Sequence, residues 1–392
     1  MTQLFTLLKI SDGLAIQFGA DGLGRMFLCL DTVMWILVGI YAFKYKEHMK
    51  HTKRFFAFYL LTYLMLAALS MAANYLTMYL CFEFMTLLSM PMVLQDGTPE
   101  SIAAARKYLM YSIFGATLGL LGFFFSAHYG AGTVFTPGGL LDPAKVAGNE
   151  SKLLVVAFLS IAGFSAKAGM FPLHAWLPTA HPVAPAPASA VLSGVITKAG
   201  VLCILRVMYQ VYGASFLAGT WVQKALIVLS LITVFMGSMM AYGEDLLKRR
   251  LAYSTVSQVS YVLFGLFTMT QWGVMGALMR MERRGKEEIS QRDLEEATRL
   301  AHPTMTEILK RLEKKEFLRA EQSGRDRRCK CIHATEKAYL LRDEVAEVEN
   351  KTFSWLCKGL SPEQIEALLS ATDVMLQNAR QDCKKGRDCG CD

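Results

Sequence analysis

The first 279 residues of this 392-residue chain have few charged side chains. They contain 18 lysines and arginines and 11 aspartates and glutamates, whereas residues 280–392 contain 23 and 22. Most of the net charge of +8 therefore lies in a part that is apolar over long runs, where it says little about nucleic acid. The composition argues against a single soluble domain and predicts a membrane domain followed by a soluble one.

Regularly spaced cysteines and a secretion signal are also missing. The nine cysteines are scattered, which argues against a secreted disulfide framework. Lys9, Asp12 and Asp21 interrupt the first 24 residues, so we expect no cleavable signal peptide. The cysteine-containing tail, 383–392, has no nearby histidine, and a flexible tail is favoured over a soft-metal site. The sequence predicts no catalytic residue, metal site or cofactor.

Eight apolar segments of about 20 residues are long enough to cross a bilayer. They are residues 25–43, 54–71, 75–94, 103–127, 152–171, 188–211, 221–242 and 251–268. The last segment is the weakest, because five hydroxyl or amide side chains make its insertion depend on neighbouring helices. Five prolines between residues 171 and 187 exclude a continuous helix there. After an N-terminal segment, 1–24, we predict an all-α polytopic membrane bundle over residues 25–268.

The basic loops predict the orientation. Cations fill residues 44–54 and 248–250, whereas the loops at 73–74 and 212–220 carry no charge. Positively charged loops stay in the cytoplasm. We therefore expect the N-terminus to lie outside a bacterial or archaeal plasma membrane. A spanning segment at 251–268 would then place the rest of the chain outside as well.

Three ionisable residues stand out inside the apolar spans: Glu83, Lys167 and Lys198. Charged groups within a membrane are costly and usually functional. An ammonium group taken out of water loses its proton more readily, and a nearby carboxylate opposes this effect, so such a pair can take up and release a proton. The alternative is that Glu83 or Lys167 only ties two helices together.

One long motif surrounds the two lysines. The stretch AGFSAKAGMFPLHAWLPTAHPVAPAPASAVLSGVITKAGVLCILRV, with GEDLLKRRLAYSTVSQVSYVLFG after it, resembles the antiporter-like membrane subunits of complex I, of multisubunit cation/proton antiporters and of membrane-bound hydrogenases. The resemblance covers about residues 10–267 and implies that other subunits of a membrane complex are partners. It also implies a proton relay, whose members are Glu83, Lys167, Lys198, His174 and His181. For the two histidines, packing and loop hydrogen bonding are the alternative roles.

The chain departs from this family in its extent. Family members have about fourteen spans in two inverted repeats. The resemblance here begins near the third family span and stops within the tenth. The second repeat, with its own lysine and its path to the outside, is mostly missing. We therefore do not expect a complete proton path within this chain.

The residues from 269 onward follow the pattern of short amphipathic helices and a hairpin. Ser290 and Asp293 resemble a capping box that opens one helix. A second helix follows, in which apolar residues recur at i, i+3, i+4 and i+7 and face inward: Met305, Ile308, Leu309 and Leu312. Two strands surround a turn at 323–324. This order predicts an α+β winged helix-turn-helix domain over residues 269–382.

Basic residues gather on the second helix and near the hairpin tip. Residues 310–330 contain nine basic and four acidic side chains. A helix-turn-helix with a basic hairpin is typical of proteins that read double-stranded DNA, with the second helix in the major groove. The candidate DNA-contacting residues of this pattern are Thr304, Thr306, Lys310, Arg311, Arg325, Arg327 and Arg328. The alternative is a solvated basic face on a protein-binding winged helix.

The strings EEISQRDLEEATRLAHPTMTEILKRLEKKEFLRAE and GRDRRCKCIHATEKA resemble the MarR family of transcriptional regulators. The resemblance implies that Asp326 orients Arg328 toward the minor groove. It also implies a weak homodimer through residues 336–382. Arg299, Glu316 and Ala338 stand where that family usually has glycine. The first dimerisation helix of the family is replaced here by the last membrane segment.

Two functional hypotheses from different classes follow. The first is a fused or chimeric chain, which joins part of a proton-translocating subunit of a respiratory NADH-quinone oxidoreductase, antiporter or hydrogenase complex to a MarR-type regulator. The second is a membrane-tethered transcription factor whose membrane half is an anchor or sensor. The stretch TMTQWGVMGAL fits both families, which is typical of a join by recombination or by mis-assembly of two genes. The orientation argument also favours the fused chain.

Overall fold

The computed structural model describes residues 4–11, 14–136, 138–285, 288–298, 302–322, 330–344, 347, 361, 366 and 370. The chain divides into two compact units. The larger takes in residues 2–277 and 292–308, and the smaller takes in residues 278–291 and those from 309 onward.

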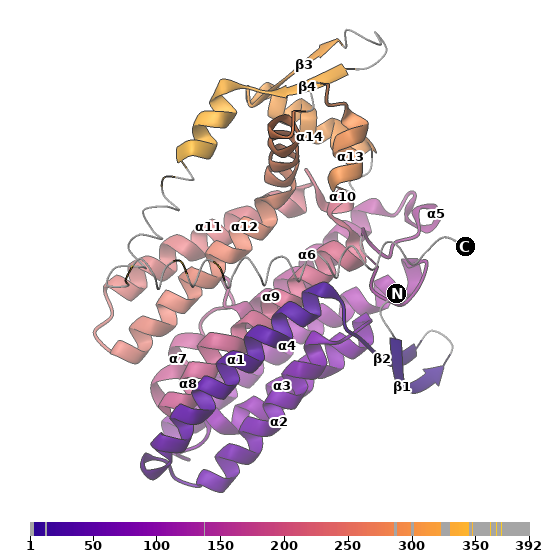
Figure 1. Ribbon diagram of the computed structural model, residues 1–392. Helices are drawn as coiled ribbons and strands as arrows, with labels where there is room; N and C mark the ends of the chain where they lie inside the picture. The colour runs from indigo at the N-terminus through magenta and orange to yellow at the C-terminus, as the bar shows by residue number, and fades with distance from the viewer. Residues whose placement is uncertain are drawn as a thin grey trace. The chain divides into compact units, whose positions relative to one another are not determined.

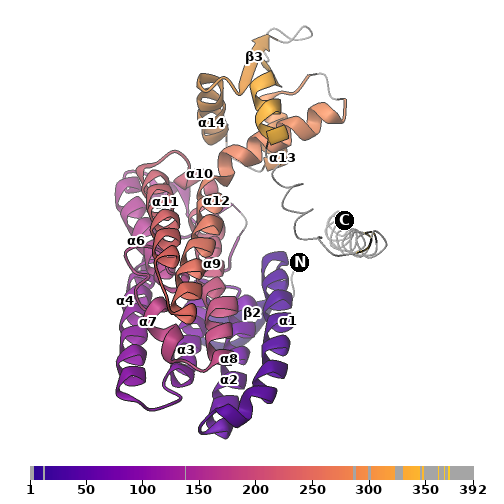
Figure 2. The same cartoon turned by 90° about the vertical axis from the view of Figure 1, so that its left-hand side faces the viewer.

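The larger unit is a helical bundle preceded by an antiparallel hairpin, β1 (Leu4–Ser11) and β2 (Leu14–Gly19). Figures 1 and 2 show its long helices running side by side. The helices up to the centre of the bundle are α1 (Gly22–Tyr45), α2 (Thr52–Ser70), α3 (Tyr75–Val93), α4 (Pro99–Tyr129), α5 (Pro143–Val146) and α6 (Glu150–Ala168). They are followed by α7 (Leu177–Val183), α8 (Ala186–Val191), α9 (Thr197–Arg206), α10 (Ala214–Leu217), α11 (Trp221–Tyr242) and α12 (Leu247–Arg283).

Seven of the described helical stretches are long and apolar enough to cross a membrane. They are residues 22–48, 52–70, 75–93, 99–129, 150–168, 186–212 and 221–242. These seven coincide with the first seven predicted spans, and the predicted membrane bundle is confirmed. The eighth predicted span, 251–268, forms part of the 37-residue helix α12.

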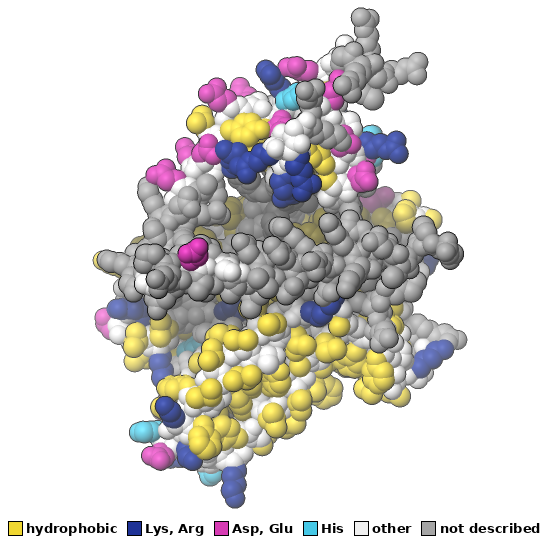
Figure 3. All heavy atoms as spheres, in the orientation of Figure 1, with side chains coloured by type: hydrophobic (Ala, Val, Ile, Leu, Met, Phe, Trp, Pro, Cys, Tyr) yellow, Lys and Arg dark blue, Asp and Glu magenta, His cyan; other side chains and the backbone are white. Residues whose placement is uncertain are grey.

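The outer surface of the bundle is apolar, as a lipid-facing surface requires. On α1, for example, Met26, Leu30, Val33, Ile36 and Leu37 are all exposed. Figure 3 shows a broad band of hydrophobic side chains over this face of the larger unit, with charged side chains and histidines near its lower end. The residues on the opposite face of α1, among them Phe27, Trp35 and Val38, are buried inside the bundle.

The membrane bundle is interrupted where the prolines predicted a break. Helix α6 ends at Ala168, and Gly169 follows with a φ of +84°, a left-handed conformation that suits glycine. The short helices α7 and α8 come next, and a π-helical turn, η2 (Leu192–Ile196), leads into α9. A second π-helical turn, η3 (Val207–Tyr212), ends the span. Such π-helical turns are frequent at functional sites.

The C-terminal elements follow one another in the predicted order. They are α13 (Gln291–Thr298), α14 (His302–Lys314) and the antiparallel pair β3 (Leu318–Gln322) and β4 (Lys330–Ala334). Helix α13 begins directly after Ser290, where the capping box was predicted. The four apolar positions of α14 predicted to face inward are all buried. These helices and the hairpin confirm the winged-helix fold class.

Glu316 adopts a backbone conformation that favours glycine. Its φ is +62°, in the left-handed region, between the end of α14 and the start of β3. An L-residue with a Cβ is strained there. The strain gives a physical reason why the MarR-like pattern has glycine at this position.

Candidate functional site

Lys167 lies at the end of α6 and is 1% exposed, although it is a lysine within an apolar helix. Its Nζ donates three hydrogen bonds to hydroxyls, at 2.8 Å to Thr86, 2.7 Å to Tyr108 and 3.2 Å to Ser112. It also lies 4.3 Å from the centroid of the Tyr108 ring, within the range of a cation–π interaction. An ammonium group has three donors, and all three are used here. We call this arrangement the hydroxyl cage.

Small residues bring the helices of the hydroxyl cage close together. An added Cβ on Gly163 of α6 would lie 2.3 Å from the backbone oxygen of Gly115 on α4, and one on Gly119 would lie 2.8 Å from the Phe164 ring. Only glycine therefore permits this approach. The close packing of α4 against α6 places the Tyr108 and Ser112 hydroxyls, both on α4, beside Lys167.

Glu83 lies on α3, one helical turn before Thr86, and its side chain is half-buried. Residues i and i+3 share a face of a helix, so the carboxylate lies on the side of α3 that contacts the hydroxyl cage. The hydrogen-bond partners of Lys167 are hydroxyls. No hydrogen bond or ion pair joins Lys167 directly to Glu83, both of which the structure describes.

A second polar cluster surrounds His181 on α7. The imidazole is 1% exposed, its Nδ1 lies 2.5 Å from the Ser189 Oγ, and its Nε2 lies 3.2 Å from the Ser193 Oγ. The same Ser193 accepts a hydrogen bond from Lys198 at its backbone oxygen and one from the Thr255 hydroxyl at its Oγ. The π-helical turn η2 thus connects His181 with Lys198 through one serine.

His174 lies in the broken segment between α6 and α7. Its ring stacks on Phe171 at a centroid distance of 6.0 Å. The Nδ1 atom is buried without a hydrogen-bond partner in the part of the chain that the structure describes. Lys167 and Glu83 therefore lie on two helices, α6 and α3, that both contribute to the hydroxyl cage. His181 and Lys198 both hydrogen-bond to Ser193. His174 takes part in neither set of hydrogen bonds.

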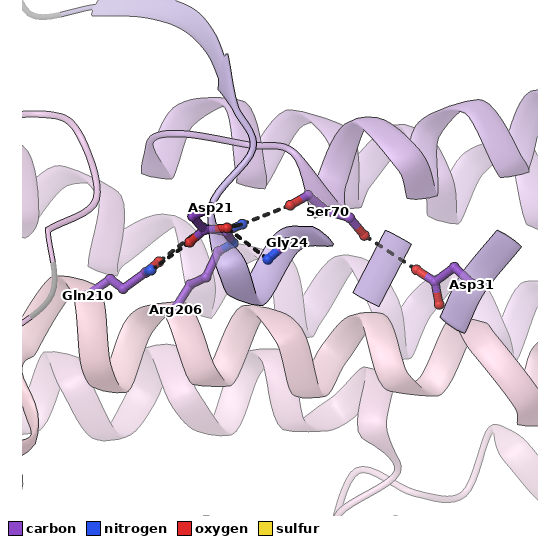
Figure 4. A network of polar contacts seen from close by, with 6 residues as sticks. All are labelled: Asp21, Gly24, Asp31, Ser70, Arg206 and Gln210. Atoms are coloured by element: carbon purple, nitrogen blue, oxygen red, sulfur yellow. Dashed lines mark hydrogen bonds and ion pairs between the residues drawn. The ribbon is translucent and has the colours of Figure 1, made fainter. Parts of the chain in front are cut away.

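A third polar network joins the N-terminal end of α1 to the C-terminal end of α9. Arg206 is 1% exposed and donates at 3.1 Å and 3.3 Å to Asp21, which caps α1, and at 2.8 Å to the Ser70 backbone oxygen. Gln210 contacts both Arg206 and Asp21. The Ser70 hydroxyl in turn donates to Asp31, as Figure 4 shows.

Sequence reasoning missed two kinds of residue in these networks. The first are the hydroxyls of the cage and of the His181 cluster, whose signal was only a polar side chain inside an apolar helix. The second are Asp31 and Arg206, which are ionisable residues within predicted spans. The rule that singled out Lys167 applies to both of them.

The candidate DNA-contacting residues are only partly described. On α14, Lys310 is exposed, Arg311 is half-buried, and the Thr306 hydroxyl donates to the backbone oxygen of His302. The side chain of Thr304 lies outside the described residues. So do all four candidate residues of the hairpin tip, Arg325, Asp326, Arg327 and Arg328.

Comparison with known proteins gives relatives for both parts. The family described as NADH:quinone oxidoreductase/Mrp antiporter, transmembrane, matches residues 72–282, and the MarR family matches residues 267–328. The chain is 31% identical over 270 residues to NAD(P)H-quinone oxidoreductase chain 4 1 of Synechococcus sp. (strain JA-2-3B'a(2-13)), covering 69% of this chain and 49% of the relative. It is 29% identical over 283 residues to NADH-quinone oxidoreductase subunit M of Rickettsia prowazekii, covering 70% and 54%.

Solved structures give the same fold. A chain of the Mrp complex from Dietzia sp. DQ12-45-1b superposes with a TM-score of 0.58 at 20% identity, covering 78% of this chain and 52% of that one. A chain of the membrane-bound sulfane sulfur reductase, an archaeal respiratory membrane complex, superposes with a TM-score of 0.55 at 22% identity, covering 66% and 52%. The chain thus spans about half the length of the relatives that it matches.

The bundle, with its broken helix and buried lysine, defines an antiporter-like multi-pass membrane subunit. The chain belongs to the NADH:quinone oxidoreductase/Mrp antiporter transmembrane family, and the MarR family model matches residues 267–328, at the end of its membrane part and beyond. The two family matches overlap at residues 267–282, within α12. This overlap includes the whole stretch TMTQWGVMGAL, residues 268–278, which the sequence pattern had marked as fitting both families.

Proposed function

We propose that the membrane part of this chain is a proton-relay subunit of a larger membrane complex, in which Lys167 carries the proton. The observation that carries this proposal is the hydroxyl cage. A hydroxyl can donate or accept a hydrogen bond by rotating. Thr86, Tyr108 and Ser112 can therefore accept from the ammonium form of Lys167 and, after it loses a proton, one of them can donate to the neutral amine.

The alternative role of Lys167 is a helix-to-helix tie, and the contacts argue against it. A tie is strongest when an ammonium group meets a carboxylate, because the two charges then compensate each other inside the membrane. Here the direct partners are neutral hydroxyls. Glu83, one turn from Thr86, is close enough along α3 to serve as the next member of the relay, and the His181–Ser193–Lys198 cluster supplies further members.

The full chain, purified and reconstituted into vesicles, tests this proposal. A potassium diffusion potential drives protons inward, and a pH-sensitive dye reports the flux. The second repeat, with the family's path to the outside, is mostly missing here, so the flux that we propose crosses within the described bundle alone. On this proposal the wild type exceeds protein-free vesicles and Lys167→Met falls to their level. The matched control is Lys224→Met, the same substitution at an exposed lysine of α11, which should retain the flux. Equal flux in Lys167→Met and Lys224→Met would refute the role of Lys167.

For the intact chain we propose a fusion of this partial subunit with a MarR-type DNA-binding domain. The packing of residues 251–268 supports the spanning orientation that favours a fusion. Thr255 donates to Ser193, and Ser257 contacts Ser238 and the backbone oxygen of Val234, so neighbouring helices satisfy polar groups that lipid would not. With its start at the basic loop 248–250, a spanning α12 leads out of the cytoplasm and away from DNA.

The alternative function is a membrane-tethered regulator, which needs the MarR-like domain in the cytoplasm. Reporter fusions after Tyr212 and after Arg284 distinguish the two. With a reporter active only in the cytoplasm, we expect silence at both positions. Activity after Arg284 with silence after Tyr212 would mean that 251–268 does not cross, and it would support the tethered regulator instead.

A further inference from the structure

Asp31 is an acidic residue in the middle of a buried apolar stripe. The other buried side chains along α1 include Phe27, Trp35, Val38 and Ala42, which recur at helical spacing on its inward face. Asp31 is 6% exposed and occupies the position between Phe27 and Trp35. A carboxylate at such a position is costly in a membrane unless a positive charge compensates it or a proton neutralises it.

The positive charge in the network around Asp31 is that of Arg206, whose terminal nitrogens already have other partners. Arg206 uses its two terminal nitrogens for Asp21, Gln210 and the Ser70 backbone oxygen. Asp31 receives one hydrogen bond, from the Ser70 hydroxyl at 3.4 Å. Ser70 is the link between the two acids, since its carbonyl accepts from Arg206 and its hydroxyl donates to Asp31 (Figure 4).

Asp31 and Lys198 lie at similar distances along their helices from the Asp21–Arg206 ion pair. It is ten residues beyond Asp21 on α1, or about 15 Å at the rise of an α-helix, and Lys198 is eight residues before Arg206, or about 12 Å. The helices run in opposite directions and their ends meet in the Asp21–Arg206 ion pair. Helix α1 contacts α8 and η2, the segments that precede Lys198.

We propose that Asp31 is a proton-binding carboxyl group that connects the inner relay with the outer end of the bundle. This inference rests on the function proposed above. At rest Asp31 is a carboxylic acid. It releases its proton past Ser70 and Asp21 to the water outside the membrane. The Asp31 carboxylate then takes a proton from the Lys198 ammonium group through water, which leaves a neutral amine at Lys198. Arg206 does not lose a proton, and its hydrogen bonds hold Asp21 in place.

Infrared difference spectroscopy and proton flux, both on the full chain, test this proposal. Asp31→Asn should remove a carboxylic-acid C=O band at neutral pH that the wild type shows. Asp245→Asn, at an exposed aspartate, is the matched control and should leave that band in place. In vesicles, Asp31→Asn should lose the flux, and Asp245→Asn should keep it. Thermal unfolding of each variant checks that the fold is retained.

The outcomes separate this inference from the function on which it rests. An unchanged acid band in Asp31→Asn overturns the inference, because Asp31 is then ionised at rest. A lost band with wild-type flux also overturns it, because the carboxyl is then protonated but off the route. A wild-type chain without flux refutes the proposed function and the route together, and in that case the band still shows whether Asp31 binds a proton.

Discussion

The substitution Gly163→Ala should separate α4 from α6 and disturb the hydroxyl cage. The new Cβ would lie 2.3 Å from the Gly115 backbone oxygen, against 3.4 Å for an ordinary contact, so the helices must move apart by about 1 Å. The Lys167–Ser112 hydrogen bond is already 3.2 Å long. A shift of this size would take it beyond the roughly 3.6 Å at which a hydrogen bond is lost.

The energy of this change has two parts with opposite signs. Alanine is favoured over glycine within a helix by about 1 kcal/mol. Overpacking of a close interface costs about 1–3 kcal/mol. Gly265→Ala in α12 is the matched control, because an added Cβ there meets nothing within 4 Å and gains the helical preference without the clash. We therefore expect Gly163→Ala to be less stable than Gly265→Ala by about 1–3 kcal/mol.

Unfolding of the detergent-solubilised chain by increasing SDS, followed by circular dichroism, measures this difference. The vesicle flux assay provides a second readout, in which Gly163→Ala should fall below Gly265→Ala. A Gly163→Ala chain that is as stable as Gly265→Ala and equally active would refute the role of this glycine contact in placing Ser112 and Tyr108.

Three further predictions concern the C-terminal elements. Glu316→Gly should relieve a backbone strained at a φ of +62° and raise the free energy of unfolding by up to about 1 kcal/mol, which a higher unfolding temperature would report. Glu316→Ala keeps the Cβ and loses the ion pair with Lys337, so it should not raise the unfolding temperature. Burial and the hydrogen bond to Glu282 raise the pKa of Tyr339 to about 12. The free energy of unfolding of the wild type should therefore fall between pH 10 and 12, and that of Tyr339→Phe should fall less. Parallel profiles of unfolding free energy against pH would contradict this. Arg328→Ala in the full chain should weaken duplex binding and lower its salt slope by roughly 1, and an unchanged slope would exclude a phosphate contact.

Much of the fold could be predicted because membrane helices and short amphipathic helices leave strong patterns. Long apolar runs gave seven spans, and the cluster of prolines gave the break after α6. The weak segment 251–268 was harder, because its polar residues look unfavourable until the partners of Thr255 on η2 and of Ser257 on α11 are known. Those partners are distant in sequence, and no local pattern indicates them.

Only the charged residues of the candidate site could be predicted from the sequence. Lys167 and Glu83 are conspicuous because an ionisable group in an apolar segment is rare. The hydroxyls that surround Lys167 come from α3 and α4, more than 50 residues earlier in the chain, and serine, threonine and tyrosine are common enough in membrane helices to carry little signal. Which of them contact the lysine depends on the glycine-mediated approach of α4 to α6.

Proton flux through the Lys167→Arg variant tests the central claim most directly. Arginine keeps the positive charge and can still donate to the hydroxyls of the cage, but it does not release its proton in a protein. If Lys167 carries the proton, a folded Lys167→Arg chain should show only the flux of protein-free vesicles. If Lys167 is only a charged tie between helices, the same variant should conduct protons like the wild type, and the proposed relay would be wrong.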